Sequence, residues 1–309
     1  MIEPYVRELS AALAAVGIRG RLRQRILLET EDHLRSDPEG VARFGSAVIV
    51  AKRFADELST AKTRAAAYAA FAALATAGAG LTAALVLANK ANDLFVGDGI
   101  ELAVALAAAW FIVLAPQLAF VAGSLALVRA IRRRDADVVP ANEVHLLRRR
   151  TLIAVGSGWV TILALAVYAA LKGGPEPVWW TPVVLGVCGA AALALAWATA
   201  RLLVAARLRP VAQGLAGDAL EDLEAVLRFV PVLGRLRLSS HPLLVCVVFA
   251  GTALLAVFLP DALAGRPIWG AMNVIFEAVA LSAGMWLFGD SLGLRPDRRT
   301  RDDARCQPD

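Results

Sequence analysis

Cysteine and histidine are scarce in this chain, with three residues of each among 309. The cysteines lie inside apolar runs or near the C-terminus, and their spacing fits neither a disulfide framework nor a zinc site. His33, His145 and His241 are far apart in the sequence. Glu29 and His33, four residues apart on one predicted helix, would supply only half of a metal site. We therefore expect no bound metal.

The sequence also lacks the short motifs that accompany common enzyme chemistry. It contains no glycine-rich phosphate loop, no HExxH pair and no GxSxG nucleophile elbow. Residues 1–60 are charged and amphipathic, so we expect no signal peptide ahead of the first apolar segment. These absences favour a protein that is not an enzyme and needs no cofactor, and any active transport would depend on a partner or an ion gradient.

Apolar residues are abundant: they make up 58% of the chain, and the mean hydropathy is +0.61. They are concentrated in blocks of about 20 residues, the length that a helix needs to cross the hydrocarbon of a bilayer. The fold class we predict is all-α, a polytopic membrane protein with six transmembrane helices. The predicted spans are 66–88, 102–128, 151–171, 178–203, 242–260 and 268–289.

The distribution of basic residues predicts the orientation. Of the 32 lysine and arginine residues, only Lys90, Lys172 and Arg266 lie in the loops after the first, third and fifth spans. The positive-inside rule then places both termini in the cytoplasm of a bacterial cell, with the protein in the inner membrane. The loop between the second and third spans carries a cluster of seven: Arg129, Arg132, Arg133, Arg134, Arg148, Arg149 and Arg150.

We expect this cluster to lie against the anionic lipids of the inner leaflet, because each basic residue near such a surface contributes about 1 kcal/mol of attraction. A net charge of +5 would suggest nucleic acid only if a soluble basic face existed. Here the basic residues flank membrane segments, so no direct nucleic-acid partner is expected.

Three parts follow from these patterns. Residues 1–61 form a small cytoplasmic helical domain, residues 62–290 form the six-helix membrane domain, and residues 291–309 form a basic, disordered cytoplasmic tail. Residues 218–230 have a helical apolar stripe and form either an interfacial helix on the inner leaflet or a docking helix for a partner. Pro116 predicts a kink or tilt in the second span.

Glu277 is the strongest candidate for intramembrane chemistry, because it lies near the middle of the sixth span. A charge there costs about 2.5–3.5 kcal/mol, so we expect a protonated side chain. Asn273 is one turn away on the same face, and Thr252 and Gln117 lie at similar depths on other spans. These residues favour a polar staple between helices over a proton or cation relay.

The N-terminal domain shows helical periodicity interrupted by Gly17 and Gly20, and a second helix over 21–35. Ser46 is an N-cap for the next helix. The apolar stripe predicted for that helix is Ala47, Val48, Ala51, Phe54 and Leu58.

Residues 5–60 resemble the HAAS domain of bacterial membrane proteins. The matching residues are Tyr5-Val6 and Leu9, Ile26 to Glu29, Glu31 to Leu34, Phe44-Gly45, and Ala51, Phe54, Ala55 and Leu58. The family usually has Asp-Pro after that glycine, where this chain has Ser46-Ala47. The resemblance implies a cytoplasmic module in a signalling protein, often encoded beside a PadR-type transcription regulator, and it carries over no catalytic residue.

We therefore expect a non-enzymatic membrane signalling or regulatory protein whose N-terminal domain contacts a cytoplasmic partner. The candidate contact surface is Glu29, Glu31 and His33 on the second helix. The alternative is a transporter or permease subunit that uses Glu277, and a membrane enzyme ranks third. The sequence leaves the oligomeric state open, a homo-oligomer included.

Overall fold

The computed structural model describes residues 2–36, 44–88, 100–172, 181–213 and 267–292. Within these ranges the secondary structure is helical, without strands. The helices are α1 (Ile2–Ala15), α2 (Gly20–Ser36), α4 (Ala47–Ala88), α5 (Ile100–Arg132), α6 (Ala141–Lys172), α7 (Thr181–Ala206) and α11 (Pro267–Leu292). The predicted all-α class is confirmed for this part of the chain.

Three of the described helices are long and apolar enough to cross a membrane. They are the stretches Trp110–Arg132 in α5, Ala141–Val167 in α6 and Leu185–Ala206 in α7, and they overlap the second, third and fourth predicted spans. The first and sixth predicted spans, 66–88 and 268–289, are helical within α4 and α11. The fifth span, the segment 218–230 and residues 293–309 of the tail lie outside the described residues. The chain is thus a membrane protein by the length and composition of its helices.

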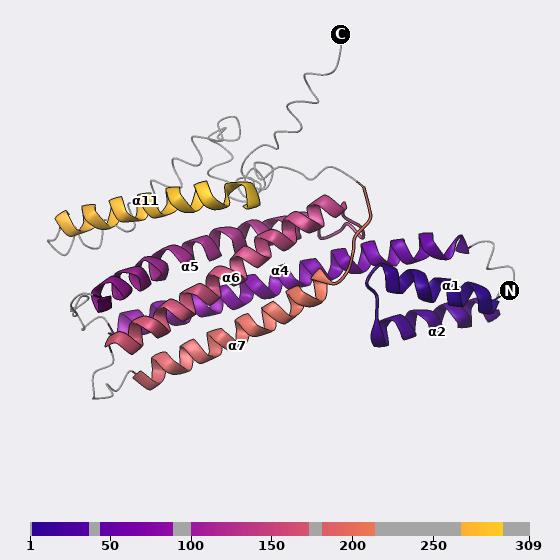
Figure 1. Ribbon diagram of the computed structural model, residues 1–309, viewed down its shortest axis with the longest axis horizontal. Coiled ribbons are helices and arrows are strands. Elements are labelled where there is room, and N and C mark those ends of the chain that lie inside the picture. Colours follow the sequence, from indigo (N-terminus) through magenta and orange to yellow (C-terminus); the bar gives the residue numbers. More distant parts are fainter. Residues whose placement is uncertain (1, 37–43, 89–99, 173–180, 214–266, 293–309) are drawn as a thin grey trace, which may run out of the picture.

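Helices α4, α5, α6 and α7 lie side by side as a bundle, and α11 packs against α5 and α6 (Figure 1). The interior is rich in alanine, which lets helix backbones approach closely. On α4 the buried side chains include Ala66, Ala70 and Ala73, and the facing positions of α7 include Leu195 and Ala198. Small residues therefore determine how closely α4 and α7 pack.

Helices α1 and α2 lie beside the part of α4 that projects beyond the bundle (Figure 1). Their apolar side chains and those of α4 form one cluster, which we call the N-terminal core. Its buried members are Tyr5, Leu9, Leu13, Ile18, Ile26, Leu34, Ala47, Ala51, Ala55 and Leu208. Leu208 lies just after α7, so the N-terminal core contains a residue from the far end of the chain segment that forms α4 to α7.

The local signals in the N-terminal sequence correspond to real features. Gly17 and Gly20 both have positive φ, at 91° and 64°, and they separate α1 from α2. The Ser46 hydroxyl accepts a hydrogen bond from the Ile49 backbone nitrogen at 3.4 Å, as expected of an N-cap. The predicted stripe on α4 is wrong at Val48, which is 44% exposed, because Ala55 faces the core with Ala47 and Ala51.

Candidate functional site

Polar side chains gather where the bundle meets the N-terminal helices, and we call this region the polar junction. It consists of consecutive turns of α4 around residues 56–64, the hairpin between α5 and α6, and residues 207–213. These last seven residues follow α7, and we call them the strap. The junction is described below from α4 outward, because α4 supplies a buried polar face there: Asp56, Ser59, Thr60 and Thr63.

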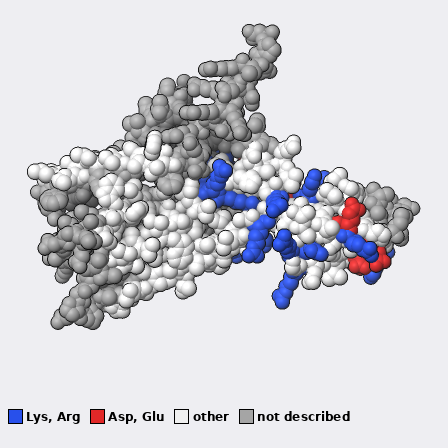
Figure 2. All heavy atoms as spheres, viewed as in Figure 1, with Lys and Arg blue, Asp and Glu red and all other residues white. Residues whose placement is uncertain are grey.

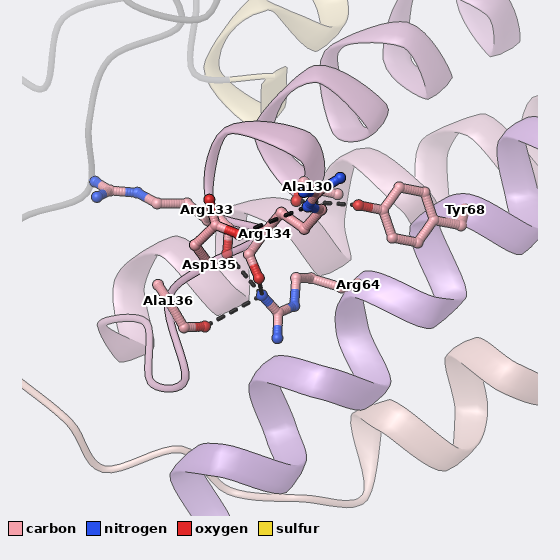
Figure 3. A network of polar contacts seen from close by, with 7 residues as sticks. All are labelled: Arg64, Tyr68, Ala130, Arg133, Arg134, Asp135 and Ala136. Carbon is pink, nitrogen blue, oxygen red and sulfur yellow. Dashed lines mark hydrogen bonds and ion pairs between the residues drawn. The ribbon is translucent and has the colours of Figure 1, made fainter.

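Arg64 of α4 holds the end of α5 (Figure 3). Its Nη1 donates hydrogen bonds to the carbonyl oxygens of Arg133 and Arg134, both at 2.6 Å, and of Ala136 at 3.1 Å. These three acceptors lie in the turn directly after α5, which ends at Arg132, so no helix supplies partners for their carbonyl groups. One turn further along α4, the Tyr68 hydroxyl donates to the Ala130 carbonyl at 3.3 Å. A single face of α4 thus caps α5.

The two ends of the α5–α6 hairpin are tied together by an ion pair. Arg133 donates from Nε to Glu143 Oε2 at 3.1 Å and from Nη2 to Glu143 Oε1 at 2.7 Å. This two-point geometry is the strongest form of an arginine–carboxylate contact. The Glu143 side chain is only 1% exposed, so the pair lies partly out of water. The Thr60 hydroxyl attaches this hairpin to α4, because it accepts a hydrogen bond from the Val139 backbone nitrogen at 3.2 Å.

The strap makes hydrogen bonds to three different parts of the structure. Asp56 Oδ1 accepts from the backbone nitrogens of Val211 at 2.6 Å and Ala212 at 3.0 Å. The Arg209 nitrogen donates to the Val16 carbonyl at 3.2 Å, and the Ala212 carbonyl accepts from the Ala141 nitrogen at 2.8 Å. The strap therefore connects α4, the turn between α1 and α2, and the start of α6.

Two further contacts fit the strap closely to its surroundings. Arg148 of α6 donates from Nη1 to the Leu208 carbonyl at 3.0 Å and from Nε to the Thr63 hydroxyl at 3.1 Å. On the other side, a Cβ built on Gly17 would lie 2.2 Å from the Arg207 carbonyl oxygen. Only glycine fits there, because the backbone of the strap occupies the place of a side chain.

A small cavity lies inside the junction. About 10 Å³ is open to the centre of a water-sized sphere, which is room for about one water molecule and not for a substrate. Its polar lining is Thr60, Thr63, Arg64, Arg129, Arg133 and Glu143. Within the described residues no group of three or more His, Cys, Asp or Glu side chains could hold a metal ion. The contacts of the junction thus join α4, the α5–α6 hairpin and the strap to one another.

The seven arginines of the predicted lipid-facing cluster differ in their exposure and in their contacts. Arg132, Arg134 and Arg149 are exposed, as a contact with lipid headgroups requires. The expectation of a wholly lipid-facing cluster is wrong for Arg129 and Arg150, which are 3% and 0% exposed. Arg150 donates from Nη1 to the Leu125 carbonyl at 3.3 Å. Arg133 and Arg148 belong to the junction, since they bond Glu143 and the strap.

The candidate partner surface lies on the outside of α2. Glu29 and His33 are exposed and Glu31 is half-buried. Glu29 Oε1 accepts from Arg25 Nε at 2.7 Å, and Glu31 Oε1 accepts from Arg35 Nη2 at 2.6 Å. Both carboxylates of the candidate surface are thus paired with an arginine of the same helix.

The intramembrane polar set is only partly described. Gln117 is half-buried in α5, and α11, which carries Asn273 and Glu277, packs against α5 and α6. The side chains of Asn273 and Glu277 and the whole of Thr252 lie outside the described residues. A polar staple between these helices stays a prediction.

Sequence reasoning missed the polar face of α4. Just before the first apolar segment, Thr60 follows Asp56 by four residues, and Thr63 and Arg64 follow Thr60 by three and four, which places them on one side of a helix. That spacing was the available signal, although it does not reveal the partners.

Comparisons with protein-family models, with curated proteins and with solved structures find no match for this chain.

Proposed function

We propose that this chain is a non-enzymatic signalling protein of the bacterial inner membrane, in which the N-terminal helices convey the state of the membrane bundle to a cytoplasmic protein. The observation that carries the proposal is the double connection between the two parts. Helix α4 runs unbroken from the N-terminal core into the bundle, and the strap returns from α7 to the same core.

This arrangement couples movement in the bundle to the N-terminal helices. Leu208 is buried in the N-terminal core, and Arg209 bonds the turn between α1 and α2. A shift of α7 along α4 must therefore either move the strap in that core or break its hydrogen bonds. Packed interfaces of this kind switch between discrete arrangements rather than deforming continuously.

The proposed topology has six spans and both termini in the cytoplasm. It is supported by the alternation of basic and nearly cation-free loops along the sequence. Figure 2 shows the same segregation in space: lysine and arginine gather where the bundle meets the N-terminal helices, while most of the described bundle surface in that view carries no charge. A cluster of cations at this level fits the headgroup region of the inner leaflet.

Single cysteines placed in a version without the native cysteines test this topology. Cysteine at Lys90 or Lys172 should react with a membrane-impermeant maleimide in intact cells, and cysteine at Arg134 should react only after lysis. Labelling of position 134 in intact cells would overturn the orientation.

The proposed partner is a transcription regulator of the kind that the HAAS resemblance implies, bound through α2. Glu29 and His33 are one turn apart and exposed, so Glu29→Lys with His33→Ala changes the surface without touching the N-terminal core. This double variant should lose co-purification with a regulator encoded beside the gene. Lys52→Glu on the exposed face of α4 is the matched control and should retain it. If the regulator co-purifies equally with the wild type, the double variant and Lys52→Glu, then α2 is not the contact surface.

A further inference from the structure

The outer face of α7 carries a stacked pair of side chains. The guanidinium carbon of Arg201 lies 4.5 Å from the centroid of the Trp197 ring, one helical turn away. Trp197 is 51% exposed, and Arg201 is exposed as well. The opposite face of the helix is occupied, because Leu195, Ala198 and Leu202 are buried in the bundle. The pair therefore points away from the described helices of the bundle.

The pair lies at the level of a membrane interface. Arg201 is five residues before the end of the apolar stretch Leu185–Ala206, about 7–8 Å along a helix. Next to it, Leu202 packs with Ala66 of α4, close to the polar junction formed by Thr63 and Arg64. Tyr68, whose hydroxyl bonds the end of α5, lies one turn further. Tryptophan and tyrosine concentrate at this depth, between hydrocarbon and headgroups.

Within the described ranges, the N–H groups of Arg201 make no hydrogen bond to another side chain or to the backbone. Among the described residues no carboxylate pairs with it, and its recorded contact is the indole ring. Stacking engages the flat face of a guanidinium and leaves its five N–H donors at the edges. Those edges match the geometry of a phosphate, which arginine binds at two points. At the edge of a bilayer, phosphate is the acceptor present in quantity.

We propose that Trp197 and Arg201 form a binding site for the phosphate group of an anionic phospholipid, in the leaflet beside the N-terminal helices. The indole ring holds the guanidinium flat against α7, and the N–H edges receive the phosphate oxygens. The bound lipid fixes the depth of α7, the helix that leads directly into the strap. The site requires only that α7 spans the membrane, so it stands independently of the signalling proposal.

Lipid titration of the full-length protein in a mild, uncharged detergent tests the site. Thermal unfolding is followed while phosphatidylglycerol, phosphatidylcholine or inorganic phosphate is added. The wild-type protein should bind phosphatidylglycerol about fivefold more tightly than Arg201→Gln, the loss expected for one cation at an anionic surface. Trp197→Phe should keep most of the affinity, and Trp197→Leu should lose part of it. Lys52→Gln, which removes an exposed cation from the part of α4 beside the N-terminal helices, is the control and should match the wild type.

The comparison has definite contrary outcomes. Equal phosphatidylglycerol affinity for the wild type and Arg201→Gln would overturn the site. If inorganic phosphate alone raises the melting temperature by the same amount, and the rise depends on Arg201, the ligand is a free anion and the assignment to a lipid is wrong. If Arg201→Gln does not fold, Arg201→Lys and Trp197→Leu still decide, because each weakens the stacked geometry while keeping a cation; wild-type affinity in both would reject the proposal.

Discussion

Asp56 and Val211 are joined by a 2.6 Å hydrogen bond between the carboxylate of α4 and the backbone nitrogen of the strap, although they are 155 residues apart. The same carboxylate oxygen accepts from Ala212, so one buried side chain satisfies two backbone donors of an irregular segment. Backbone groups that leave water need such partners. This carboxylate is therefore one of the groups that fix the position of the strap, together with Arg148 and the backbone contacts of Arg209 and Ala212.

Replacing Asp56 by alanine should release the strap. Hydrogen bonds to charged groups contribute about 1.5–3 kcal/mol each, and the backbone N–H groups of Val211 and Ala212 would lose their acceptor. We expect a lower melting temperature and faster proteolysis within residues 207–213. Asp56→Asn keeps an acceptor oxygen, so its melting temperature and its proteolysis rate should lie between those of the wild type and of Asp56→Ala. A proteolysis rate for Asp56→Ala equal to that of the wild type would show that the strap is held by its other contacts.

Gly17 and Gly20 offer a matched comparison of backbone strain and steric fit. Both have positive φ, but a Cβ would meet the Arg207 carbonyl only at Gly17, whereas nothing lies within 4 Å at Gly20. Each alanine substitution adds about 1–2 kcal/mol of left-handed strain. Gly17→Ala should therefore be the more destabilising in thermal unfolding, and it alone should expose the strap to protease. Similar behaviour of the two variants would mean that the strap shifts aside at little cost.

The sequence was sufficient where a pattern depends on neighbours along the chain. The break between α1 and α2 follows from Gly17 and Gly20, and the start of α4 follows from Ser46. The long helices follow from apolar length. These features need no knowledge of what packs against them, because their cause is local.

The polar junction could not be derived in the same way, because its partners are remote. The spacing of Thr60 and Arg64 places them on one side of α4, but their partners are in the α5–α6 hairpin, about 70–80 residues further on. The arginine cluster shows the same limit. A count of charge treats Arg129 and Arg132 alike, and only the packing of α5 shows that the first is buried and the second exposed.

The ion pair of Arg133 and Glu143 should stabilise the hairpin measurably. A double-mutant cycle with Arg133→Ala and Glu143→Ala should give a coupling of about 1–2 kcal/mol, below the range for fully buried pairs because the Arg133 side chain is 45% exposed. The pair of Arg25 and Glu29 on α2 has the same 2.7 Å distance but lies in solvent, and its cycle should show no clear coupling. Equal coupling for both pairs would mean that burial of Glu143 adds nothing.

Glu277→Gln tests the predicted staple. A glutamine has the shape and hydrogen-bonding capacity of a protonated glutamate, so the variant should be expressed, inserted and as heat-stable as the wild type. Glu277→Leu, which cannot form a hydrogen bond, should be less stable if the staple is real. Loss of a transport activity in Glu277→Gln with unchanged stability would instead favour a relay.

Tyr5 should make the N-terminal core sensitive to alkaline pH. Burial, and secondarily the negative charge of Glu8, raise the pKa of Tyr5 above its usual value of 10.0, and its hydroxyl has no hydrogen-bond partner among the described residues. The folded state therefore holds the phenol proton more tightly than the unfolded chain does. Its contribution to the free energy of unfolding is complete below about pH 10 and is lost as the pH rises through the higher folded-state pKa.

The Tyr5→Phe variant isolates this effect. It removes a buried, unsatisfied hydroxyl and should be as stable as the wild type or more so at pH 8. Above about pH 10 the melting temperature of the wild type should fall more than that of the variant, because only the wild type has a phenol to ionise at that position. Parallel pH profiles for the two proteins would show that the Tyr5 hydroxyl is in contact with water in the folded state.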